Sequence, residues 1–144
     1  MKDGRPSIYE FLHTYMERVH NKDSLSENFN FVDENGREVF LQLKWFKGSP
    51  GVNGDLIIKV VSIKPRGGNA ITLAVDELLK CKDAVKWGLN KVVMESILDR
   101  ELFEKLKLRG WVERPGIYNN LYRYAPHYRE PTLEDILKMR GMRS

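Results

Sequence analysis

Residues 55–71 read DLIIKVVSIKPRGGNAI, and this segment constrains the architecture more than any other. Its first part, residues 56–63, is a nearly continuous run of apolar and β-branched side chains, which favours a central strand covered on both faces. A proline and two glycines within residues 65–68 end that run abruptly. Asn69 is suited to cap a helix that starts directly afterwards. The segment therefore predicts a buried strand, a glycine-bearing turn and a helix in succession.

The helix and a second strand follow along the chain. Apolar residues at helical spacing continue from Ile71 to Val85, with Cys81 on the same stripe. Gly88 suits the position just past the end of such a helix. The run KVVMESI at residues 91–97 then has the composition of a strand. Residues 55–97 are thus expected to form a β–loop–α–β unit, whose crossover is right-handed if the two strands are parallel.

A helix and a hairpin are predicted before that unit. Ser7 and Glu10 have the spacing of a capping box, and an apolar stripe follows them as far as Val19. Alternation of apolar and polar residues around 28–31 and 39–46 predicts two strands. Asn35-Gly36 lies between them and predicts a tight turn with two positive-φ residues. Residues 48–54, rich in glycine, are expected to form a loop.

The C-terminal third predicts shorter elements. Asp99 is positioned to cap a third helix that ends before Gly110. Two short strands are expected near 111–113 and 121–124, joined through Pro115-Gly116 and Asn119-Asn120, and a helix over 132–140 follows. No internal repeat is present. The fold class is α+β: a single domain over residues 1–128 with a mixed, mostly antiparallel central sheet flanked by helices, and a helical tail at residues 129–144.

Composition excludes several classes of protein. The chain has 144 residues, a formal net charge of +4 and one cysteine, so an internal disulfide and a thiolate metal site are excluded and a reducing compartment is indicated. No apolar run approaches the roughly 18 residues of a membrane span, and the first residues, MKDGRPS, lack a signal-peptide pattern. A cytoplasmic protein without a membrane partner is expected. The basic excess is mild and concentrated toward the C-terminus, where Glu101, Glu104 and Glu113 dilute it, which disfavours nucleic acid as a partner.

The loop at residues 64–71, KPRGGNAI, is the candidate binding site. A glycine turn at a helix N-terminus exposes backbone N–H groups that can hold a phosphate or pyrophosphate, and Lys64 and Arg66 add positive charge. An equally simple interpretation is a strand-to-helix turn with no ligand. The sequence matches neither the P-loop pattern nor the dinucleotide-binding fingerprint.

The order of elements around this loop resembles the GCN5-related N-acetyltransferase (GNAT) family, in which an acyl-CoA pyrophosphate loop follows a central strand and opens a helix. The run LFEKLKLRGW at residues 102–111 is similar to a helical segment that follows the next strand in that family. The resemblance implies transfer of an acetyl group from acetyl-CoA, as co-substrate, to an amine of an unknown small-molecule or protein acceptor. It also implies a set of residues that contact acetyl-CoA: Ile63, Lys64, Arg66, Gly67, Gly68, Asn69, Ala70, Asp99 and Phe103.

The chain departs from the family pattern where catalysis is concerned. Phe103 stands where many members carry a tyrosine that protonates the departing thiolate, and strand 56–63 has no carboxylate to act as a base. Glu95 and Tyr122 are the substitute candidates for base and acid. The alternative is a catalytically degenerate member that serves as a binding or assembly protein, of the kind a phage genome reuses. The oligomeric state stays open, since helix 132–140 could dock on a partner chain or fold back.

The remaining reactive side chains are interpreted as structural. His13 and His20 lie on the first helix and His127 lies beyond the last strand, and none has companion ligands at metal-binding spacing in the sequence. Surface roles are therefore expected for all three. Cys81 is expected to be a small core residue rather than a nucleophile.

Overall fold

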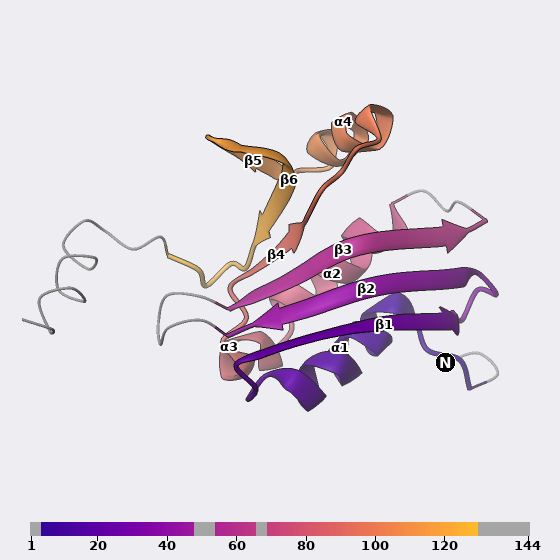
Figure 1. Cartoon of the computed structure of the whole chain (residues 1–144). Coiled ribbons are helices and arrows are strands. Elements are labelled where there is room, and N and C mark those ends of the chain that lie inside the picture. Colours follow the sequence, from indigo (N-terminus) through magenta and orange to yellow (C-terminus); the bar gives the residue numbers. More distant parts are fainter. Residues whose placement is uncertain (1–3, 48–53, 66–68, 130–144) are drawn as a thin grey trace, which may run out of the picture.

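The computed structural model describes residues 4–47, 54–65 and 69–129, which form a single α+β domain (Figure 1). Its mixed sheet has six strands, whose order in the sheet is β1 (Ser24–Val32), β2 (Glu38–Phe46), β3 (Asp55–Lys64), β4 (Lys91–Met94), β6 (Ile117–Tyr124) and β5 (Val112–Arg114). Every neighbouring pair is antiparallel except β3 and β4, which are parallel. The mixed, mostly antiparallel sheet flanked by helices is therefore confirmed. The tail at residues 130–144, with its predicted helix, lies outside the described residues.

Helix α1 (Ile8–Val19) starts where the capping box predicts. The Ser7 hydroxyl accepts a hydrogen bond from the Glu10 N–H at 3.0 Å, and the Glu10 carboxylate accepts one from the Ser7 N–H at 2.9 Å. The Ser7 hydrogen bonds hold the pKa of Glu10 below its usual value. Its apolar stripe is buried and packs beside α2.

Strands β1 (Ser24–Val32) and β2 (Glu38–Phe46) form the predicted hairpin. On β2 the residues of one face are buried, namely Val39, Leu41, Leu43 and Trp45. The turn differs from the prediction because only Gly36 has a positive φ, at 78°. Instead of a two-residue turn, a wider loop connects the strands. The buried Asp33 carboxylate stabilises this loop, since it accepts hydrogen bonds from the N–H groups of Asn35 and Arg37.

The long helix predicted after β3 (Asp55–Lys64) is broken into α2 (Ala70–Lys80) and α3 (Asp83–Trp87). Cys81 adopts an extended backbone at the break and is only partly buried. A continuous helix would bury Val85 on the stripe, whereas the break exposes Val85 and buries Trp87. Burial of the larger indole removes more apolar surface from water, which explains the change of direction. Figure 1 shows α1, α2 and α3 on one face of strands β1 to β3.

The C-terminal elements follow the predicted order with different bounds. Strand β4 spans only Lys91–Met94, so the predicted strand over 91–97 is too long. Helix α4 (Arg100–Leu108) is capped by Asp99 as predicted. Strand β5 (Val112–Arg114) turns directly into β6 (Ile117–Tyr124), so Asn119 and Asn120 lie inside a strand rather than in a link. The pairing of β6 with β4 begins only at Leu121, and the two asparagines before it contact the segment after β4: the Asn120 side-chain oxygen accepts a hydrogen bond from the Ser96 N–H at 3.0 Å.

A buried polar contact ties α2 to the segment before β5. The Trp111 Nε1–H donates to the Thr72 hydroxyl at 2.9 Å, and both side chains are almost fully buried. Replacing Thr72 with valine keeps the shape but leaves the indole N–H without its acceptor. We expect a loss of about 1–2 kcal/mol in the free energy of unfolding, measured by urea denaturation. Thr72→Ser retains the hydroxyl and should lose less; equal losses would show that the threonine methyl group contributes as much to stability as the hydrogen bond.

No helix in the described part of the chain is long and apolar enough to cross a membrane.

Candidate functional site

The parallel strands β3 and β4 separate after a short paired stretch. They pair from Asp55 with Lys91 to Ile58 with Met94, and the Glu95 N–H donates to the Ile58 carbonyl at 3.0 Å. Beyond that point β3 continues to Lys64, whereas the segment that follows β4 turns toward β6 (Figure 1). There the Ile97 N–H donates to the Asn119 carbonyl at 2.7 Å. Within the described residues, no strand pairs with the β4-facing edge of β3 beyond Ile58.

An irregularity in β3 reverses which side chains face the helices. The register with β2 shifts so that Leu43 pairs with Ile58 but Gln42 pairs with Val60, which leaves Lys59 as an extra residue. Before the shift Leu56 and Ile58 are buried in the core, and after it Val61 and Ile63 pack against the same core. The prediction of a central strand covered on both faces does not hold at Lys59, which is exposed, whereas Leu56 and Ile58 are buried.

The predicted cofactor residues lie around the end of β3 and the start of α2. Ile63 is partly buried against the core and Lys64 is exposed. Ala70 is the first residue of α2, and Asn69 occupies the N-cap position without making a side-chain capping hydrogen bond. Arg66, Gly67 and Gly68 lie outside the described residues. The structure thus describes both ends of the predicted loop: one end follows the central strand β3, and the other leads into the N-terminus of α2.

Asp99 and Phe103 have structural roles at the start of α4. The Asp99 carboxylate accepts a hydrogen bond from the Leu102 N–H at 3.2 Å. The Phe103 ring is 1% exposed and belongs to the core, with the Arg100 guanidinium 4.3 Å from its centroid. The Asp99 carboxylate thus caps α4 and the Phe103 ring fixes this helix on the core, where α4 contacts β6.

Glu95 and Tyr122 lie on neighbouring segments at the point of separation. Glu95 follows β4 directly, is half-buried and is anchored through its N–H to Ile58. Tyr122 lies on β6 opposite Val93, which is two residues before Glu95. The Tyr122 ring is 7% exposed and stacks on Tyr124 with centroids 6.4 Å apart. The topology therefore brings a carboxylate and a phenol to the same region of the sheet.

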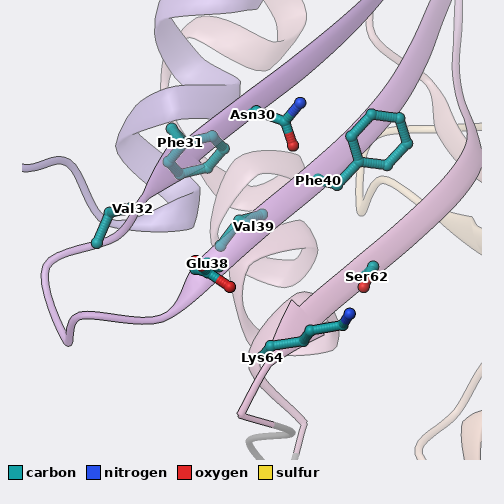
Figure 2. Close-up of a pocket in the computed structure, with 8 residues that line it drawn as sticks. All are labelled: Asn30, Phe31, Val32, Glu38, Val39, Phe40, Ser62 and Lys64. Carbon is teal, nitrogen blue, oxygen red and sulfur yellow. The ribbon is translucent and has the colours of Figure 1, made fainter.

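A shallow groove of about 450 Å³ lies over the ends of β1, β2 and β3. Figure 2 shows side chains from these three strands gathered around it. Glu38 and Lys64 are register partners on adjacent strands, so a carboxylate and an ammonium group border the groove together with the Phe40 ring. Lys64 belongs both to this groove and to the predicted phosphate loop. The full lining is Asn30, Phe31, Val32, Glu38, Val39, Phe40, Ser62 and Lys64.

Arg123, which the sequence places between two tyrosines, is committed to a structural contact. Its guanidinium forms a two-point ion pair with the Asp76 carboxylate of α2, with an Nη2 to Oδ2 distance of 2.9 Å. It also donates to the Arg109 carbonyl at 2.8 Å. The alternating aromatic and basic pattern of β6 therefore does not supply a guanidinium for nucleic-acid contact.

Three side chains that could ligate a metal ion meet between α1 and α3. The ligand atoms of His13, Glu17 and Asp83 all lie within 4.8 Å of one another. The expectation that His13 has no acidic companions is therefore wrong. Glu17 is four residues further along the same helix, which is a signal the sequence did contain, whereas Asp83 arrives only through the packing of α3.

A scan against protein-family models found no match, and a search of the curated proteins found none either.

Proposed function

We propose that this chain is an N-acetyltransferase-like protein of the GNAT type, which transfers an acetyl group from acetyl-CoA to an amine. The observation that carries this proposal is the pair of parallel strands, β3 and β4, that pair over four residues and then separate at Ile58, while β3 continues to Lys64 and is followed by the segment that leads into α2. Separated strands leave backbone groups available to a bound pantetheine arm, and the start of α2 offers N–H groups to its pyrophosphate. The sheet order and the position of α4 also agree with the expected succession of elements.

The proposed reaction is a direct transfer. The amine nitrogen bonds to the thioester carbonyl carbon while the carbon–sulfur bond breaks. An ammonium substrate loses two protons in total: Glu95 would accept one through water, and the thiolate would receive the other by way of the Tyr122 hydroxyl. A backbone N–H on the unpaired edge of β3 would stabilise the negative charge that develops on the carbonyl oxygen. Lys64 at the end of β3 would add positive charge beside the pyrophosphate.

Binding of acetyl-CoA is the first test. We expect a saturable heat on calorimetric titration, together with a rise in the thermal midpoint of unfolding. The same titration with Lys64→Gln should show weaker binding, because a positive charge beside the phosphates is lost. Neither heat nor stabilisation at concentrations up to about 1 mM, which corresponds to about −4 kcal/mol of binding free energy, would refute the proposal.

Catalysis is tested separately through Glu95. If it is the general base, Glu95→Gln should reduce CoA release in the presence of a suitable amine by about 10²-fold or more, with acetyl-CoA affinity unchanged. Glu101→Gln is the matched control, since Glu101 is exposed on α4 and pairs only with Lys105 among the ion pairs described. An equal rate for Glu95→Gln and the control would exclude Glu95 as the base.

The degenerate alternative is favoured by one observation. Phe103 cannot donate a proton and is enclosed in the core, so it contributes packing rather than chemistry. A binding or assembly protein with this fold would take up acetyl-CoA, or a related acyl-CoA, without turnover. Binding of acetyl-CoA with no CoA release across a panel of primary amines, polyamines and lysine peptides would select this alternative.

A further inference from the structure

The cluster of His13, Glu17 and Asp83 lies on the helical layer and shares no residue with the proposed acyl-transfer site. His13 and Glu17 are one helical turn apart on α1, and Asp83 is the first residue of α3. The His13 Nε2 atom is already 2.8 Å from the Asp83 Oδ2 atom. One imidazole and two carboxylates at such separations are the donor types that zinc and related divalent ions bind.

We propose that His13, Glu17 and Asp83 form a binding site for a divalent transition-metal ion with the coordination preferences of zinc. Neighbouring ligand atoms around a tetrahedral zinc ion lie about 3.3 Å apart. The ligand atoms lie within 4.8 Å of one another, so in the proposed site the two carboxylate side chains adjust by about 1–2 Å around a fixed imidazole to reach that spacing. Three protein ligands would leave the fourth position to water.

The side chains around the cluster favour ion binding because they hold the His13 ring in place and leave the cluster open to solvent. Trp87 is 3% exposed and packs edge-on against the His13 ring with centroids 4.8 Å apart, which limits rotation of the imidazole. The His13 and Asp83 side chains are 28% and 20% exposed, which leaves a route for an ion to enter.

Lys86 occupies the same cluster as a competing cation. Its ammonium nitrogen is 3.4 Å from Glu17 Oε1 and 3.8 Å from Asp83 Oδ1. It is 58% exposed, so it can move into solvent when another cation arrives. The lysine thus neutralises the carboxylates in the absence of metal and must lose both contacts when metal binds. Removal of the Lys86 ammonium group should therefore tighten metal binding, which would not be observed if the cluster were only a surface ion-pair network.

The experiment uses the full chain without a polyhistidine tag, treated with a chelator and titrated with Co²⁺ and then Zn²⁺. We expect one equivalent of Co²⁺ to produce visible absorption bands that Zn²⁺ abolishes, and saturating Zn²⁺ to raise the thermal midpoint by about 5 °C. His13→Gln and Glu17→Gln should each weaken binding by about 10-fold or more. Lys86→Gln should tighten binding by about 3-fold or more at low ionic strength.

His20→Gln is the matched control, because His20 is the C-cap residue of the same helix and its ring contacts the Met16 carbonyl rather than the cluster. It should bind Co²⁺ as the unmodified chain does. Glu17 is 40% exposed, so Glu17→Gln tests the site even if His13→Gln loses packing against Trp87. The proposal is overturned if neither the unmodified chain nor Lys86→Gln binds Co²⁺ below about 100 µM, or if Glu17→Gln binds as tightly as His20→Gln.

Discussion

Gly54→Ala should lower the free energy of unfolding by about 3 kcal/mol, the largest loss we expect from any methyl-sized change in the described residues. A Cβ atom at this position would lie 1.8 Å from the Gly88 carbonyl oxygen and 2.9 Å from its carbon. Both are backbone atoms, so no side chain can rotate away. The φ of Gly54 is +150°, which adds backbone strain for any L-residue.

Hydrogen bonds prevent the two segments from moving apart to relieve this clash. The Gly54 carbonyl accepts from the Asn90 N–H at 2.9 Å and from the Lys91 N–H at 3.2 Å. These contacts set the start of β3 against the start of β4, so a shift here would misalign the parallel pair that leads to the proposed site. We therefore expect Gly54→Ala to weaken acetyl-CoA binding in the same preparation that shows reduced stability.

The contribution of the clash with Gly88 is obtained by comparing the free energies of unfolding of Gly54→Ala and Gly36→Ala, measured by chemical denaturation. Gly36 also has a positive φ, +78°, but a Cβ there would meet nothing within 4 Å. Gly36→Ala should therefore lose only about 1 kcal/mol, from backbone strain alone. If the two variants lose the same free energy, the close approach to Gly88 does not limit this position.

The elements that could be predicted from sequence are those governed by local periodicity and caps. The alternation over 39–46 correctly predicts strand β2, and Ser7 with Glu10 correctly predicts the start of α1, because both signals depend on neighbours within four residues. Asp99 identifies the start of α4 for the same reason.

What could not be predicted depends on tertiary contacts. The break between α2 and α3 contains no proline or glycine, and it follows from the burial of Trp87 against α1. The short β4 follows from the hydrogen bonds that divert Ser96 and Ile97 toward β6. The cluster around His13 needs Asp83 from a helix 70 residues away. The role of Asp33 in the hairpin could not be predicted either. Buried carboxylates are rare, and only the folded turn shows that the N–H groups of Asn35 and Arg37 compensate for the burial of this one.

Arg123→Met should lower the free energy of unfolding by about 2–3 kcal/mol. The guanidinium connects three elements, since it pairs with Asp76 on α2, donates to the carbonyl of Arg109 after α4, and itself lies on β6. The two side chains are only 19% and 26% exposed, so removal of the arginine leaves a poorly solvated carboxylate and carbonyl without donors. Methionine retains much of the packing, so the loss reports the polar contacts.

A double-mutant cycle with Asp76→Asn separates the ion pair from the other contacts of Arg123. We expect a coupling of about 1–2 kcal/mol, measured by urea denaturation, because the two substitutions remove the same pair. Arg100→Met is the matched control: its pair with Glu104 is 62% and 58% exposed, and its loss should stay within about 0.5 kcal/mol. Additive losses for Asp76→Asn and Arg123→Met would contradict this account. The stability of the β6–α2 connection would then rest on the hydrogen bond to Arg109 and on the burial of Trp111.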